Sequence, residues 1–408
     1  MPNRQQENDG RVQEREEKIN STKNDVTKLS KVMDAIIHKD RLSAFEAIDS
    51  NLLTYNPNSF WIIFRLRGRN LQIIIFPLLF LLILDVVWYF CLTPIMQAID
   101  DNYNFDQQGL SEDIREQVEY LEKLINPLLF PVSFLLVYRL NRAAVRYWSA
   151  RAAAGMIITA CRTLISMVVA GCHDNIDTID GFARWTCIFP VAVKRFLRPS
   201  YQNKSFLGFA RIDTETTNDN DGEIGSVLYN QDIPAFNKSQ YAPIYVMDKL
   251  RKLAWNVTKH DFHGTESKNA LLYRQLNEKI DEMASSWGTM ERISGTPLPF
   301  VYVAHLRTFL LLYLAIWHLI SITLGEWITI VPLFLASWGL LGIDAAAVEC
   351  ERPFYWHGNH LALGRMCGVA SLNIHQTLDQ LKDEKEALLE ELSTERDQDI
   401  IADETLNA

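Results

Sequence analysis

Apolar residues in this chain are gathered into four long blocks that are separated by polar and charged segments. The blocks cover approximately residues 71–96, 126–146, 300–324 and 327–347. Each is about long enough to cross a hydrocarbon core of about 30 Å as a helix that rises roughly 1.5 Å per residue. A buried helix of a soluble protein is rarely so long and so apolar on all sides. The pattern therefore predicts an all-α integral membrane protein with four transmembrane helices.

The segments outside these blocks are polar, and several show the spacing of amphipathic helices. We predict a partly disordered cytosolic N-terminal segment over 1–55 and a membrane domain over 56–380. That domain would include a set of cytosolic helices over 151–290. Residues 381–408 are predicted to be the end of a C-terminal helix followed by a disordered tail.

Charge predicts which side of the membrane each segment occupies. Arginines precede the first block and follow the second, whereas residues 97–123 are acidic. The positive-inside rule then places both termini on the cytosolic side, or on an equivalent side such as a stroma. The sequence leaves open whether this is the plasma membrane, an organelle membrane or the thylakoid membrane. The net charge of −10 disfavours a nucleic-acid partner.

Recognisable catalytic and cofactor motifs are absent from the sequence, which contains no nucleophile elbow, P-loop, dinucleotide fingerprint or HExxH. We therefore expect no enzyme activity and no cofactor. The six cysteines are widely spaced, which favours reduced thiols over zinc ligands or disulfides. His357 and His360, near Glu349 and Glu351, have only a weak metal-ligand spacing, so no metal site is expected.

A few ionisable residues fall inside the apolar blocks and have alternative interpretations. Asp85 in the first block is expected to bond to a neighbouring helix, with a role in conduction as the alternative. His305 and His318 in the third block are either satisfied intramembrane residues or members of a proton relay. Arg139, Arg142 and Arg146 follow the apolar run at the start of the second block instead of interrupting it, which favours a role in topology over voltage sensing.

The second block carries three aromatic residues four positions apart, Phe130, Phe134 and Tyr138, which share one face of a helix. Their spacing alone favours simple packing against neighbouring helices. A different role is also physically open to them. Repeated copies of such a ring around an axis would form a narrow apolar constriction that gates by dewetting, and the positive ring edges would favour anions.

Several stretches together resemble the bestrophin family, including its plant and bacterial voltage-dependent anion-channel branch. The stretches are RLRG at 65–68, FPVSFLLVY at 130–138, VYRLNRAAVRYWSAR at 137–151, ERISGTPLPFVYVAHLRTFLLLYL at 291–314, and GIDAAAVECERPF followed by NHLAL at 342–363. The resemblance runs in order from about 60 to 380. It implies a homopentamer of four-span subunits around one central pore. Chloride would be the permeant ion, with bicarbonate and nitrate as further candidates.

The resemblance also implies roles for particular residues. Phe130, Phe134 and Tyr138 fall on the neck of the pore. Pro131 and Ser133 are predicted to support the neck and to offer dipoles to an anion. Arg139, Arg142 and Arg146 are predicted to supply a positive field at the inner mouth. Glu266, Ser267 and Asn269 are predicted to lie near a cytosolic aperture. Calcium is not supported, because Tyr355, Trp356 and His357 follow Pro353–Phe354 where animal members have acids. Ser149 also stands where a glutamate is common in the family.

The predicted function is passive, anion-selective conduction. A proton-coupled anion transporter that uses Asp85 and the intramembrane histidines is one alternative, and a non-conducting membrane scaffold is another. The expected partners are further copies of the chain, the lipid bilayer and inorganic anions.

Overall fold

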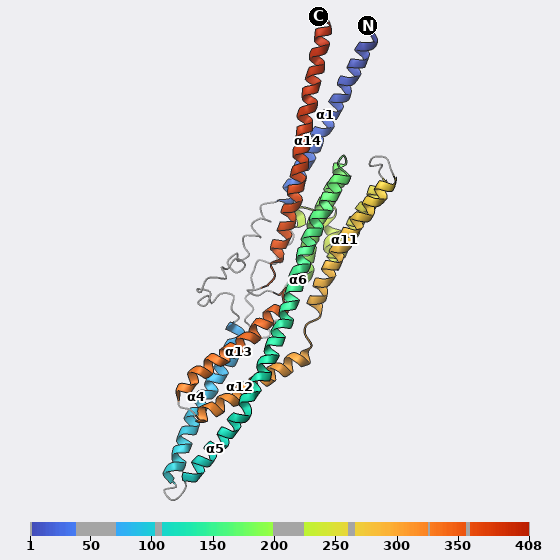
Figure 1. Ribbon diagram of the computed structural model, residues 1–408. Coiled ribbons are helices and arrows are strands. Elements are labelled where there is room, and N and C mark those ends of the chain that lie inside the picture. The colour runs from blue at the N-terminus through green and yellow to red at the C-terminus, as the bar shows by residue number, and fades with distance from the viewer. Residues whose placement is uncertain are drawn as a thin grey trace. The chain divides into compact units, whose positions relative to one another are not determined.

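The structure is a computed structural model that describes residues 2–37, 71–102, 108–198, 224–259, 266–324, 327–355 and 360–407. These residues are almost entirely helical and contain no strand (Figure 1). Four segments are long and apolar enough to cross a membrane: Ile73–Cys91, Glu116–Gly171, Phe300–Leu324 and Ile330–Glu351. The prediction of a helical protein with four such segments is confirmed for the described residues.

The chain divides into two compact units. The membrane unit contains residues 51–151 and 292–361, and the terminal unit contains residues 1–50, 152–291 and 362–408. Helix α6 (Leu129–Gly171) contributes its first part to the membrane unit and its second part to the terminal unit.

The membrane unit consists of helices that pack through apolar side chains. In chain order they are α4 (Leu71–Asn102), α5 (Gln108–Ile125), the 3₁₀ turn η2 (Asn126–Leu128), the first part of α6, α12 (Phe300–Leu324), the 3₁₀ turn η4 (Trp327–Thr329) and α13 (Ile330–Glu351). α12 packs against α4, α5 and α13, and α13 also packs against α4. The buried core draws on each of the four spans, through residues such as Leu81, Leu136, Leu314 and Leu341.

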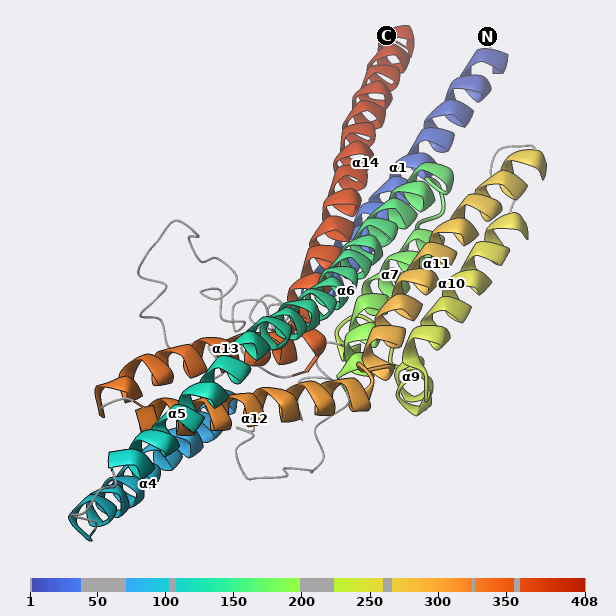
Figure 2. The same cartoon turned by 60° about the horizontal axis from the view of Figure 1, so that its bottom comes forward.

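The terminal unit is a second helical assembly. It contains α1 (Pro2–Ile36), the second part of α6, α7 (Ile176–Leu197), α9 (Ile233–Lys238), α10 (Ala242–Lys259), most of α11 (Glu266–Gly295) and α14 (Leu363–Asn407). Figure 2 shows α7 and α10 side by side, and α7 also packs against α14 and α1. The side chain of Asn175 caps α7 by accepting a hydrogen bond of 3.0 Å from the N–H of Thr178.

Helices α1 and α14 pack along each other in an antiparallel pair, with both chain ends at the same end of the pair (Figure 1). Their ion pairs join Arg15 to Asp399 and to Glu395 at 3.4 Å. The prediction placed disorder in only part of 1–55 and in the tail of 381–408, and in the structure residues 2–36 and 363–407 are helical throughout. Each segment is polar when considered alone, but the pairing buries apolar residues of both helices, including Leu29 and Leu381. The predicted N-terminal segment also includes 38–55, which lie outside the described residues.

Candidate functional site

Helix α6 begins directly after η2, so the chain passes from α5 into α6 with little interruption. Pro127 is the second residue of η2 and Pro131 is the third residue of α6, positions where a missing N–H breaks no helical hydrogen bond. The N–H of Leu129 donates to the carbonyl oxygens of Asn126 and Pro127. That N–H is therefore already satisfied within the chain. The predicted anion-binding role of Pro131 and Ser133, which are both half-buried, stays a prediction.

The three predicted neck residues lie exposed on one face of α6. Phe130 is 78% exposed, Phe134 61% and Tyr138 40%. The rings of Phe134 and Tyr138 stack, with their centroids 6.5 Å apart and their planes 20° from parallel. Within this chain, the two phenylalanines are therefore not packed into a core formed with neighbouring helices. Their apolar surface is left for lipid, another copy of the chain or a lumen.

Tyr138 connects this aromatic face to a positive charge one turn further along. The Nε–H of Arg142 donates to the hydroxyl oxygen of Tyr138 at 3.0 Å, and the guanidinium lies 5.2 Å from the centroid of the same ring. Arg142 is exposed. Tyr302 of α12 meets Tyr138 edge-on, with the ring centroids 6.4 Å apart. The aromatic face therefore ends at an exposed arginine that Tyr138 helps to hold.

The opposite face of α6 is buried and carries one charged residue among apolar ones. We call this face the buried stripe; it consists of Val132, Leu136, Arg139 and Ala143, spaced four, three and four residues apart. Arg139 is only 1% exposed, and a buried guanidinium is costly unless it is paired and hydrogen-bonded.

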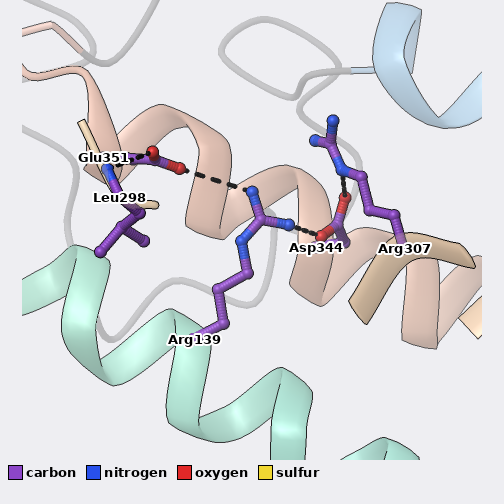
Figure 3. Close-up of polar contacts among 5 residues, drawn as sticks. All are labelled: Arg139, Leu298, Arg307, Asp344 and Glu351. Carbon is purple, nitrogen blue, oxygen red and sulfur yellow. Dashed lines mark hydrogen bonds and ion pairs between the residues drawn. The ribbon is translucent and has the colours of Figure 1, made fainter. Parts of the chain in front are cut away.

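Arg139 is paired with two carboxylates of α13 (Figure 3). One terminal nitrogen of the guanidinium donates to Asp344 and the other to Glu351 at 3.4 Å. Asp344 also accepts from Nε–H of Arg307 on α12 at 3.1 Å, and Glu351 accepts from the backbone N–H of Leu298 at 3.2 Å. We call these five residues the Arg139 network. It contains two arginines and two carboxylates, so its formal charges balance.

The arginines predicted to supply a positive field thus have three different environments. Arg139 faces the protein interior, and its charge is paired with Asp344 and Glu351, so its predicted role as a source of field stays a prediction that this burial does not favour. Arg146 is half-buried, and its Nη2 donates to the backbone oxygen of Ile293 at 2.7 Å. Arg142 is the exposed one of the three.

Asp85 forms a second buried polar cluster in the membrane unit. Nδ1 of His318 lies 2.8 Å and 2.9 Å from the two carboxylate oxygens of Asp85, and Nε2 lies 2.6 Å from the hydroxyl oxygen of Ser337. All three side chains are buried, and they come from α4, α12 and α13. The interpretation of Asp85 as bonded to a neighbouring helix is confirmed. His305, by contrast, is exposed and stacks on Phe309.

The predicted cytosolic aperture is described only in part. Asn269 is buried in the terminal unit, whereas the side chains of Glu266 and Ser267 lie outside the described ones. The aperture therefore stays a prediction. His357 also falls outside the described residues. Among the residues that are described, no group of three or more His, Cys, Asp or Glu side chains is arranged to hold a metal ion.

Sequence reasoning missed the partners of Arg139. Asp344 and Glu351 are seven residues apart in a largely apolar segment that also contains Glu349, and a spacing of seven puts two side chains on the same face of a helix. Two carboxylates on one face of a membrane-crossing helix are costly without a cation. That spacing was the available signal that a buried arginine of another span would pair with them.

Most of the chain is similar to known proteins. Residues 52–376 match the family model described as "Bacterial/Fungal Bestrophin protein". Among curated proteins, a "voltage-dependent anion channel-forming protein" of Nostoc sp. is 25% identical over 248 residues, which are 60% of this chain and 73% of the relative. The protein of the same description in Escherichia coli K12, YneE, is 23% identical over 249 residues, covering 61% of this chain and 74% of the relative.

Solved structures agree on the fold. A bacterial Bestrophin homolog from Klebsiella pneumoniae superposes with a TM-score of 0.59 at 18% sequence identity, over 75% of this chain and 98% of the other. At this identity the likeness concerns the fold alone. The family match begins at residue 52, after α1, and ends at residue 376, within α14.

Proposed function

The chain belongs to the bestrophin family, and on that premise we propose that it is a passive anion channel whose pore is lined by the aromatic face of α6. The curated relatives are named anion channel-forming proteins, which supports an anion channel as the general function. Chloride is the proposed permeant ion, with bicarbonate and nitrate as further candidates. The proposed assembly is a homopentamer in a lipid bilayer, with both termini on the cytosolic or stromal side.

The observation that carries this proposal is the exposure of Phe130, Phe134 and Tyr138 on one face of α6. Around a symmetry axis, five copies of each ring would form stacked levels of a narrow, apolar neck. Such a neck offers passing ions no hydrogen-bond partner, so it resists wetting and makes ions shed part of their hydration. Rings that turn their positive edges toward the axis would favour an anion over a cation.

Arg142 is the residue that we propose as the main source of positive potential at the inner end of the neck. It is exposed, and it lies one helical turn beyond Tyr138, which accepts its hydrogen bond. A positive charge beside a low-dielectric constriction raises the local concentration of anions. The net charge of −10 belongs to the whole chain and does not oppose this local effect.

The Asp85–His318–Ser337 cluster is the feature on which proton-coupled transport would depend. Both ring nitrogens of His318 are engaged, and all three side chains are buried in the protomer. Such a closed cluster supports a role in joining α4, α12 and α13, and it offers no exposed end from which a proton would enter. We therefore propose passive conduction.

The test is ion flux through the purified protein in liposomes or planar bilayers. We expect currents whose reversal potential follows the Nernst potential of the anion and does not respond to an imposed proton gradient. A reversal potential that moves with the proton gradient would establish the coupled transporter instead. Absence of anion flux from correctly inserted protein would favour the non-conducting scaffold.

A further inference from the structure

The buried stripe lies on the side of α6 opposite the aromatic face. Of its four residues, only Arg139 needs hydrogen-bond partners in fixed directions. We propose that the Arg139 network sets the rotation of the neck half of α6, so that Arg139 is a positioning residue for the pore-lining aromatics. This proposal rests on the proposed function, because it assigns Arg139 a role in shaping the pore. It makes α13, which carries Asp344 and Glu351, the helix that fixes which face of α6 is presented to ions.

The geometry of α6 places Arg139 opposite the two phenylalanines. At about 100° per residue, Arg139 is roughly 180° around the helix from Phe130 and about 140° from Phe134. An interaction that holds Arg139 against α13 therefore turns the aromatic side chains to the other side. A rotation by one residue would carry the guanidinium away from its carboxylates and bring Leu135 toward the position of Phe134.

The apolar members of the buried stripe cannot impose the same restriction. Val132, Leu136 and Ala143 are held by apolar burial, which is non-directional and roughly proportional to the area removed from water. Neighbouring apolar residues, such as Leu135, would replace them at little cost after a small rotation. Arg139 is different, because its planar donors match two carboxylates in one orientation only.

The network also connects α6 to more than one partner. Asp344 is shared with Arg307 of α12, and Glu351 is shared with the backbone N–H of Leu298 just before α12. Nε of Arg139 is buried and has no hydrogen-bond partner among the residues that the structure describes. A buried N–H without a partner costs free energy, and a well-packed apolar group in the same space would avoid that cost. The network is therefore expected to contribute conformational specificity more than stability.

The test measures the rotation of α6 directly, by the reactivity of cysteines introduced at positions 134 and 135. The background carries Cys91→Ser and Cys350→Ser, since the other four native cysteines are buried. Burial also raises the pKa of the Cys172 thiol to about 11, which keeps it protonated and unreactive. With the network intact, a charged thiol reagent should label Phe134→Cys rapidly and Leu135→Cys slowly, because Leu135 packs on the core.

The main variant removes Arg139 together with both of its carboxylates: Arg139→Met, Asp344→Leu and Glu351→Gln. Arg307 is retained, and its side chain is 42% exposed and can be hydrated when Asp344 is lost. Replacing all the charges of a buried ion pair or triad by uncharged groups of similar volume is often neutral or stabilising, and the glutamine retains an oxygen for the N–H of Leu298. We expect the ratio of the labelling rates at positions 134 and 135 to fall at least about ten-fold. The matched control is Arg162→Met, which removes an exposed arginine of the same helix and should leave the ratio unchanged.

A second variant covers the case in which the triple variant does not fold. Arg139→Lys keeps the charge but loses the two-pronged geometry of the guanidinium, and we expect a smaller fall in the same ratio. An unchanged ratio in whichever of the two folds would overturn the proposal. The labelling ratio could shift even though the protein with the intact network conducts no anions. That outcome would support the positioning role of Arg139 and would overturn the proposed channel function.

Discussion

The two faces of α6 differ sharply in exposure and in bonding partners, although their residues are close neighbours in the sequence. Tyr138 and Arg139 are neighbours in the chain, yet one is part of an exposed aromatic row and the other is almost completely buried. Arg139 and Arg142 are the same residue type less than one turn apart. Arg139 is enclosed by carboxylates of another span, and Arg142 is exposed and bonded to Tyr138. The role of a charged residue in this helix therefore depends on what the facing helix offers.

The difference matters because the two faces contribute differently to stability and to conduction. A residue of the buried stripe contributes through burial and pairing, so its loss should reduce the stability of the fold. A residue of the exposed face has few partners within the protomer, so its loss should change ion flow more than stability. This contrast can be tested with pairs of variants that keep the residue type and change only the face.

The largest effect is expected for Arg139→Met, which leaves Asp344 and Glu351 buried with one cation fewer. Removing one partner of a buried ion pair costs about 3–5 kcal/mol, whereas an exposed ion pair or cation–π contact is worth about 1 kcal/mol or less. Thermal unfolding in detergent should therefore show a large fall in stability for Arg139→Met and a small one for Arg142→Met. Equal losses in the two variants would contradict the assignment of Arg139 to a buried network.

A comparable contrast should hold between the two histidines of α12. His318→Ala leaves Asp85 without its partner among the membrane helices, and an unpaired aspartate at mid-membrane costs about 3 kcal/mol on insertion scales. His305→Ala removes an exposed ring and should change stability by no more than about 0.5 kcal/mol. Thermal unfolding in detergent measures the loss of stability in each of the two variants. If His318→Ala is as stable as His305→Ala, the cluster does not hold the three helices together.

How far the sequence predicts this site depends on the range of the interactions involved. The aromatic face follows from a spacing of four residues within a single helix, which is local information. The environment of Arg139 depends on Asp344, which is 205 positions away in the chain. A local sequence pattern carries no information about so distant a partner. The error was to treat three arginines of one segment as equivalent, although Arg139 falls in register with Val132 and Leu136.

The chain ends illustrate the same limit. The start of the chain and the tail after the C-terminal helix are polar enough to be predicted as disordered, because neither segment has sufficient apolar surface to be stable alone. In the structure each provides the missing surface for the other, and Arg15 finds its carboxylates near the opposite end of the chain. The four long apolar blocks needed no such partner to be recognised, so the presence of four candidate membrane helices was predicted from the sequence.

The exposed face is tested by Phe130→Ala combined with Phe134→Ala. Both rings are exposed in the protomer, so the double variant should lose less than about 1 kcal/mol of stability. Its anion conductance or leak should increase several-fold, because the apolar constriction is widened and wets more readily. The matched control is Phe76→Ala with Phe80→Ala, two exposed phenylalanines with the same spacing on α4. Unchanged currents in the first pair, or equal increases in both pairs, would remove α6 from the proposed neck.

The smallest effect is expected for Arg142→Gln, which removes charge from the exposed face and leaves the buried stripe intact. Exposed charges act over a Debye length of about 10 Å at 0.1 M salt but only about 3 Å at 1 M. Single-channel conductance should therefore fall by roughly half at low salt and approach that of the unmodified channel at 1 M. Arg162→Gln, which removes an exposed arginine of α6 outside the membrane unit, should show no such dependence. A deficit that persists at 1 M would mean that Arg142 contacts the permeating anion, because direct contact is not screened as a distant charge is.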